Sequence, residues 1–223
     1  MQRAPRAWLA WWIKRGSGIV FDALHGVDTT AGRAAPPLEI ASANRDKAVP
    51  YDPAPWGVLR RSLRLGSLQA QGFTFVDIGC GKGKILLAAL ALPFNRIIGV
   101  EFSPLLCKIA EQNIASVRFV RRSCHAAQII CCDAVDYPIP EEPTIFFFYN
   151  PFSYEIMEIV LGNIMNAHAR AACPRYLILY AASSSIPRVT EFLQKASGNG
   201  ARLQVSSLLG QRSINIFELA SRQ

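Results

Sequence analysis

The sequence predicts an α/β fold centred on a mostly parallel sheet of seven strands with helices on both faces. One observation is that short apolar runs alternate with helix-patterned segments from residue 73 onward. This alternation is typical of a parallel sheet, because each helix returns the chain to the edge where the next strand starts. A second observation is that the runs 202–208 and 213–219 are separated only by 209–212. Such a short link suits a hairpin, so the last strand should run antiparallel.

The first half of the predicted sheet is a βαβα unit. Its first strand is the apolar run 73–78, which Gly79 ends. Small apolar residues over 85–92 predict a helix, and the β-branched stretch 96–101 predicts the second strand. Apolar residues at helical spacing over 104–114 predict the next helix.

The second half continues the pattern with one difference. The runs 127–132 and 144–149 predict the third and fourth strands, and little helix is expected between them. The amphipathic stretch 154–171 predicts a helix, 176–181 predicts a fifth strand and 187–195 predicts a further helix. The closing hairpin completes the sheet.

We predict that residues 1–72 form a helical and loop segment that could cap a substrate site, in front of a domain over 73–223. Residues 26–57 are rich in Gly, Pro, Ala and charge without a sustained period, which predicts a loop. Prolines block a helix until about Pro55, which could sit in the first turn of one.

The net charge of +8 is concentrated in the N-terminal third. Residues 1–72 hold 10 Lys or Arg against 5 Asp or Glu, whereas residues 73–223 hold 14 against 11. The excess indicates either simple solubility or an acidic partner such as nucleic acid or an anionic membrane, although no aromatic–basic RNA motif accompanies it. Trp8, Trp11 and Trp12 have helical spacing, so this stripe either packs on the domain or contacts a membrane surface peripherally.

The sequence predicts a cytoplasmic protein without a transmembrane segment. The apolar run 7–13 is too short to cross a bilayer, and no signal-peptide cleavage site follows it. The 6 cysteines contain no CxxC pair and no zinc-ligand spacing with histidine. They therefore suggest buried thiols in a reducing compartment, and no metal site is predicted.

The densest functional signal is the glycine-rich loop VDIGCGKGK at residues 76–84, directly after the first predicted strand. Its glycines allow a sharp turn and a close approach of the backbone to a ligand. Asp77 at the strand end could meet a cationic ligand. A dinucleotide fingerprint would place a small residue where Lys84 stands, so the spacing disfavours NAD.

With its D-x-G-C-G-x-G pattern, this loop resembles the first motif of class I S-adenosylmethionine (SAM) methyltransferases. The resemblance implies a Rossmann-like fold and S-adenosyl-L-methionine as the cofactor. Glu101 matches the acid that bridges the two ribose hydroxyls in the family, a task that suits the two acceptor oxygens of a carboxylate. Asp133 matches the residue that accepts from the adenine amino group, and Phe102 would lie against the adenine face.

The stretch from about residue 51 to 163 also resembles a group of bacterial methyltransferases, through YDPAP at 51–55, GVEFSP at 99–104 and FYNPF at 148–152. The non-SET lysine methyltransferases are more distantly similar. The resemblance implies that Tyr51 could fold back over SAM and close the site. The residues implied to bind the cofactor are Tyr51, Asp77, Gly79, Cys80, Gly81, Gly83, Glu101, Phe102, Asp133 and Ala134.

Asn150, Pro151 and Phe152 are the candidate catalytic residues at the end of the fourth strand. They resemble the N-P-P-Y/F motif of amino methyltransferases, although one proline stands where that motif has two. In that motif the Asn oxygen accepts a hydrogen bond from an NH₂ group and points its lone pair toward the methyl group. An aromatic side chain after it supports a planar or cationic acceptor, and orientation supplies most of the catalysis.

The leading hypothesis is therefore an N-directed methyltransferase acting on an amine, which could be a protein lysine. One alternative is an O-directed or small-molecule methyltransferase with the same SAM site. Another is a SAM-binding or RNA-associated module without turnover, against which the intact loop, both carboxylates and Asn150 argue. The sequence leaves the methyl acceptor and the role of residues 1–50 open.

Overall fold

The computed structural model of the chain describes residues 18–30, 51–118, 120–170, 173–182, 186–197, 201–209 and 212–219. The three tryptophans at positions 8, 11 and 12 lie outside these ranges, so their stripe stays a prediction. The strands are β1 (Thr74–Ile78), β2 (Arg96–Glu101), β3 (Ala127–Cys131), β4 (Thr144–Phe148), β5 (Arg175–Ala182), β6 (Ala201–Leu209) and β7 (Arg212–Leu219). The helices are α2 (Val58–Leu65), α3 (Lys84–Leu90), α4 (Pro104–Ser116), the short 3₁₀ helix η3 (Ala134–Asp136), α5 (Tyr154–Arg170) and α6 (Ile186–Ser197).

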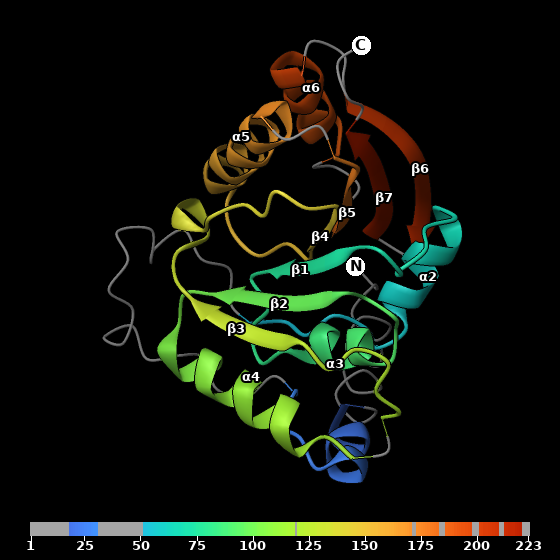
Figure 1. Cartoon of the computed structure of the whole chain (residues 1–223), viewed down its shortest axis with the longest axis vertical. Helices are drawn as coiled ribbons and strands as arrows, with labels where there is room; N and C mark the ends of the chain where they lie inside the picture. Colours follow the sequence, from blue (N-terminus) through green and yellow to red (C-terminus); the bar gives the residue numbers. More distant parts are fainter. Residues whose placement is uncertain are drawn as a thin grey trace, which may run out of the picture.

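The strands form one seven-stranded sheet in the order β3-β2-β1-β4-β5-β7-β6 (Figure 1). The first five strands in this order are mutually parallel. Strand β7 runs antiparallel both to β5 and to β6, with which it forms the closing hairpin. The predicted α/β fold with one reversed strand is confirmed. The order of the strands reverses between β1 and β4, which is where open α/β sheets bind their ligands.

The central strands β1 and β4 are buried on both faces, which explains why they are continuous apolar runs. All five residues of β1 and all five of β4 are buried. One face packs against α5 and α6, as Figure 1 shows. The other packs against α2 and α3. The central strands therefore lack the alternation of a half-exposed sheet, whereas the edge strands β3 and β6 keep exposed positions.

Helix α2 belongs to this core, because Val58, Leu59 and Leu63 are buried against it. The helix begins at Val58 rather than near Pro55, since Val58 N–H closes a turn onto the Pro55 carbonyl before the helix starts. The division of the chain at residue 72 stays a prediction. Elsewhere the predicted ends differ from the observed ones by up to two residues, because apolar spacing marks the buried face rather than the last hydrogen-bonded turn.

Residues 18–25 form a helix that the sequence did not predict (blue in Figure 1). Phe21 stacks on His25 with ring centroids 4.1 Å apart and also contacts Trp56 at 4.4 Å. The helix therefore packs on the segment that leads into α2. Its apolar residues, at 19–21, 23 and 24, are nearly contiguous rather than spaced about 3.6 residues apart, so its sequence alone gives a weak helix signal.

Candidate active site

A pocket open to solvent lies at the carboxyl ends of β1, β2 and β4. The structure brings almost all of the predicted site residues to its wall. They are Tyr51, Asp77, Gly79, Cys80, Gly81, Glu101, Phe102, Asp133, Ala134, Asn150, Pro151 and Phe152. Gly83 is the exception: it precedes α3 and faces Ala110 of α4, so its position supports helix packing rather than direct contact with a ligand.

The glycine loop is held in backbone conformations that only glycine adopts easily. Gly79 has φ +76° and Gly81 has φ +54°, both in the left-handed region. A Cβ on Gly79 would overlap Pro151, and a Cβ on Gly81 would overlap the ring of Tyr51. The missing side chains therefore let two distant segments lie directly against the loop.

Glu101 ends β2 and is almost buried at the floor of the pocket. Its two carboxylate oxygens accept hydrogen bonds from Gly81 N–H and Ser103 N–H, each at 3.0 Å. Burial raises the pKa of the Glu101 carboxyl, and these backbone donors partly oppose that shift. The carboxylate thus links the glycine loop to the β2 end, and each oxygen keeps a lone pair for a ligand hydroxyl.

Asp77 is 3% exposed and has no hydrogen-bond donor among the described residues. Burial, with the nearby Glu101 charge as a smaller cause, raises the pKa of Asp77 to about 8. A buried carboxyl of this kind favours a cationic ligand, because a positive charge would restore the ionised form. This observation fits a ligand that carries an ammonium or sulfonium group.

The opposite wall follows β3 and contains Asp133 and Ala134. The Asp133 side chain accepts from Val135 N–H at 3.1 Å and caps η3. Phe102 reaches the same pocket from the end of β2. These residues lie beyond neighbouring strand ends, so a flat ring between them would meet both an aromatic face and an acceptor oxygen.

Asn150 follows β4 and has φ +45°, a left-handed conformation that asparagine tolerates better than most residues. It is exposed at the pocket wall, whereas Pro151 is wedged against Gly79. Such a strained turn persists only where its surroundings enforce it, and strain of this kind concentrates at functional sites. The contact with Gly79 provides that enforcement.

Asp52 and Arg212 at the pocket mouth were not predicted as site residues. The Asp52 carboxylate accepts from Tyr149 Oη at 2.9 Å and from Arg212 Nη2 at 3.1 Å. The Arg212 guanidinium also lies over the Tyr149 ring, 4.5 Å from its centroid. The cluster joins the N-terminal segment, the β4 end and the start of β7. Nothing in the local sequence signals it, because its members are far apart in the chain.

Lys82 lies in the glycine loop between Gly81 and Gly83. It is 2% exposed, and its Nζ donates to Oδ1 of Asp28 at 2.6 Å and to the Thr30 carbonyl at 3.0 Å. Tyr51 Oη donates to the Thr29 carbonyl at 2.8 Å. The segment 18–30 is thereby fixed onto the back of the glycine loop.

Asn113 of α4 strengthens this attachment. Its side chain accepts from Asp28 N–H and donates to the Asp28 and Lys82 carbonyls, each contact at 2.8 Å.

Among the described residues, no group of His, Cys, Asp and Glu is arranged to hold a metal ion. None of the helices in the described part of the chain has the length and apolarity needed to cross a membrane.

The fold and the pocket define a class of protein that holds an adenosyl-type cofactor at the switch point of a parallel sheet. Residues 76–148 match the family model described as a methyltransferase domain. A ribosomal protein L11 methyltransferase from Tolumonas auensis is 41% identical over 49 residues, which cover 22% of this chain and 17% of that relative.

Solved structures share the fold at low sequence identity. The ribosomal protein L11 methylase of Lactobacillus delbrueckii subsp. bulgaricus superposes with a TM-score of 0.57 at 13% identity, covering 79% of this chain and 83% of that one. An RNA methyltransferase from Salinibacter ruber in complex with S-adenosyl-L-homocysteine gives 0.53 at 17% identity, covering 77% and 96%. Magnesium protoporphyrin IX methyltransferase of Synechocystis PCC 6803 with bound SAM gives 0.52 at 16% identity, covering 74% and 77%.

Residues 76–148 therefore carry a methyltransferase domain, as predicted, on the fold shared by these solved structures. Two of those structures hold SAM or S-adenosyl-L-homocysteine. The structural relatives act on protein, RNA and a porphyrin according to their names, so they do not define an acceptor.

Proposed function

We propose that this protein transfers the methyl group of SAM to an amino nitrogen. The observation that carries the proposal is Asn150, exposed at the pocket wall in a left-handed turn directly after β4. Its amide oxygen can accept a hydrogen bond from an NH₂ group, and its fixed turn sets the direction of that bond. The partial match to an L11 methyltransferase supports a protein acceptor, although it spans only 17% of that relative.

The cofactor would be held by residues from three strand ends. The buried Asp77 and the glycine loop would face its charged end, Glu101 would accept from the ribose hydroxyls, and Asp133 with Phe102 would hold the adenine. Bound SAM supplies an electrophilic methyl group on a sulfonium. Tyr51 already lies against Gly81, so its segment would cover the cofactor next to the glycine loop.

Labelled SAM tests the reaction class. The full-length protein is incubated with labelled SAM and cell lysate, and the product is divided into protein, nucleic acid and small molecules. Transfer to an amine predicts a label that survives mild base and disappears when lysate amines are acetylated beforehand. A base-labile label that is insensitive to acetylation would identify an O-methyl product and contradict the proposal.

Two substitutions of Asn150 distinguish the role of its side-chain amide from the role of its backbone conformation. Asn150→Ala is expected to lower turnover about 100-fold while SAM affinity stays within about twofold, because orientation is lost and the cofactor wall is kept. Asn150→Gly relieves the positive φ and also lacks the amide. Equal loss in both variants supports the side-chain role, whereas recovery in the Gly variant, or parallel loss of SAM affinity, would assign Asn150 to folding.

A further inference from the structure

Two cysteines from different elements meet behind the floor of the pocket. Cys131 is the last residue of β3 and is exposed, and its Cα partner on the neighbouring strand is Glu101. Cys107 lies on α4 and is 4% exposed. Its Sγ donates to the Glu101 carbonyl oxygen at 3.2 Å. Both cysteines therefore neighbour Glu101, Cys131 through strand pairing and Cys107 through a hydrogen bond.

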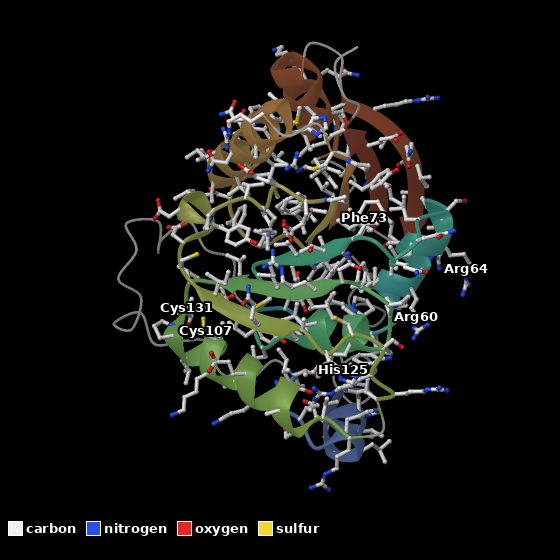
Figure 2. The ribbon with its side chains drawn as sticks, in the orientation of Figure 1. Arg60, Arg64, Phe73, Cys107, His125 and Cys131 are labelled. Carbon is white, nitrogen blue, oxygen red and sulfur yellow. The ribbon has the colours of Figure 1, made fainter. Side chains whose placement is uncertain are left out.

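The alternation along β3 directs the Cys131 side chain toward α4. Ala127 and Ile129 pack on the sheet face that carries α3, whereas Ile130 packs on the face that carries α5. Cys131 is two residues after Ile129, so its side chain leaves on the same face as Ile129. Figure 2 shows the labelled Cys107 and Cys131 next to each other there, close enough for the Cys131 thiol to influence the Cys107 thiol.

We propose that Cys131 and Cys107 form an oxidation site in which a hydroperoxide converts the two thiols to a disulfide. The Cys131 sulfur attacks the O–O bond of the hydroperoxide, giving a sulfenic acid and an alcohol, or water when the oxidant is hydrogen peroxide. The Cys107 sulfur then attacks the Cys131 sulfur, the S–S bond forms, the S–O bond breaks and water leaves. The two thiols lose two electrons, which reduce the peroxide.

The two cysteines differ in the way that such a sequence requires. Cys131 is open to the oxidant, whereas Cys107 is sheltered beneath it. Burial, with the neighbouring Cys131 thiol as a smaller cause, raises the pKa of the Cys107 thiol. Cys107 is therefore protected from direct oxidation. Its position beside Cys131, rather than its pKa, places it to resolve a sulfenic acid formed there.

The bond would join two walls of the cofactor pocket. On one side Cys107 follows Phe102 and Ser103, and on the other Cys131 precedes Asp133 and Ala134. Oxidation would also remove the thiol donor to the Glu101 carbonyl, which then keeps only its bond from Cys132 N–H. The proposed disulfide depends only on the two thiols. Its effect on SAM binding rests on the proposed function.

Mapping the disulfide tests the site without any assumption about activity. The full-length protein is treated with hydrogen peroxide, free thiols are alkylated, and digested peptides are analysed by mass spectrometry. The expected product links the peptides that carry Cys107 and Cys131. Cys131→Ser and Cys107→Ser should each abolish it, whereas Cys173→Ser, a partly exposed thiol elsewhere, should not. A bond from Cys131 to Cys132, or Cys131 remaining a thiol, would overturn the proposal.

The effect on the cofactor pocket is measured separately by calorimetry with SAM. We expect the oxidised protein to bind SAM about fivefold more weakly, the equivalent of one lost hydrogen bond, and dithiothreitol to restore the affinity. Cys131→Ser should show no response to peroxide. If the mapped disulfide leaves SAM affinity unchanged, the regulatory consequence is wrong. If neither redox form binds SAM, the proposed function fails while the mapped disulfide stands.

Discussion

The two sides of the pocket are built differently. The cofactor side consists of strand ends and their adjoining loops, so Asp77, Gly81 and Glu101 reach it from adjacent parallel strands, β1 and β2. The other side, where we propose that the methyl acceptor binds (the acceptor side), is assembled from distant segments: Asp52 precedes α2, Tyr149 follows β4 and Arg212 starts β7. The cofactor side is buried and fixed by backbone donors, whereas the acceptor cluster is partly exposed.

This difference indicates where change is tolerated. A fixed cofactor demands a fixed backbone, and the left-handed glycines with their tight neighbours provide it. Partly exposed ion pairs contribute little to stability, so the acceptor side can vary at small cost. We therefore expect substitutions on the cofactor side to disturb folding and SAM binding together, and those on the acceptor side to change the acceptor alone.

The largest effect is expected for Gly81→Ala. The new Cβ overlaps the Tyr51 ring in a backbone conformation that alanine disfavours, so the free energy of unfolding should fall by about 2 kcal/mol or more. SAM affinity, measured by calorimetry, should fall at least about tenfold. Gly72→Ala is a matched control, because Gly72 has φ +86° but open space around it. Equal losses in both variants would show that the Tyr51 contact is irrelevant, and Tyr51→Ala should partly rescue Gly81→Ala.

Asp77 predicts a pH dependence of stability. Its pKa is raised to about 8 from an ordinary 3.8, so the folded protein binds a proton there that the unfolded chain has released. Stability should therefore fall as the pH rises from about 4 to 8, by up to about 1.4 kcal/mol per pH unit. Urea unfolding across this range should show a smaller slope for Asp77→Asn. An unchanged slope would mean that Asp77 is ionised in the folded state.

A smaller effect is expected where the N-terminal segment meets the glycine loop. Asp28→Asn leaves the buried Lys82 ammonium without its carboxylate, which should cost about 1 kcal/mol because Asp28 itself is 58% exposed. Limited proteolysis should then cleave residues 18–30 faster. The exposed pair of Glu191 and Lys195 has the same 2.6 Å separation, so Glu191→Gln is the control and should change neither measurement. If Asp28→Asn and Glu191→Gln changed stability and proteolysis to the same extent, the Asp28–Lys82 pair would not be what holds residues 18–30 on the glycine loop.

The smallest effect on the fold is expected for Arg212→Gln at the pocket mouth. Arg212 is 33% exposed beside Asp52, so stability should change by less than about 1 kcal/mol, and SAM affinity should stay within about twofold. The apparent KM for the methyl-accepting fraction should rise about two- to fivefold, because the cluster borders the acceptor side. Arg202→Gln on β6 is the control. A change in SAM affinity that matches the change in KM would place Arg212 on the cofactor side instead.

Sequence patterns predicted most of the fold and the cofactor side. Strands buried on both faces are apolar throughout, and the residues that follow them mark the sheet edge where ligands bind. Glu101 and Asp133 were identified through the family resemblance, and the structure places Glu101 at the end of β2 and Asp133 two residues after β3. Gly83 shows the limit of this reasoning: it belongs to the same glycine pattern, yet it packs on Ala110 rather than lining the pocket.

The residues whose surroundings the sequence did not predict are mostly those whose partners are distant in the chain. Lys82 could not be placed, because its carboxylate, Asp28, lies 54 residues earlier. Arg212 joins Asp52 across 160 residues, and Arg212 lies in no recognisable motif. Cys131 was expected to be a buried thiol from its apolar run, but β3 ends there, at an edge of the sheet, and leaves it exposed.

The sequence by itself determined the layered sheet, the glycine turn and the acids at the strand ends, because those follow from local periodicity and from the backbone freedom of single residues. Only the tertiary structure decided which side chain fills the space above Gly81, what neutralises Lys82 and which thiol lies beside Cys107. Such pairings depend on how the whole chain packs, and the energy of any one of them is too small and too distant along the chain to appear in a local pattern.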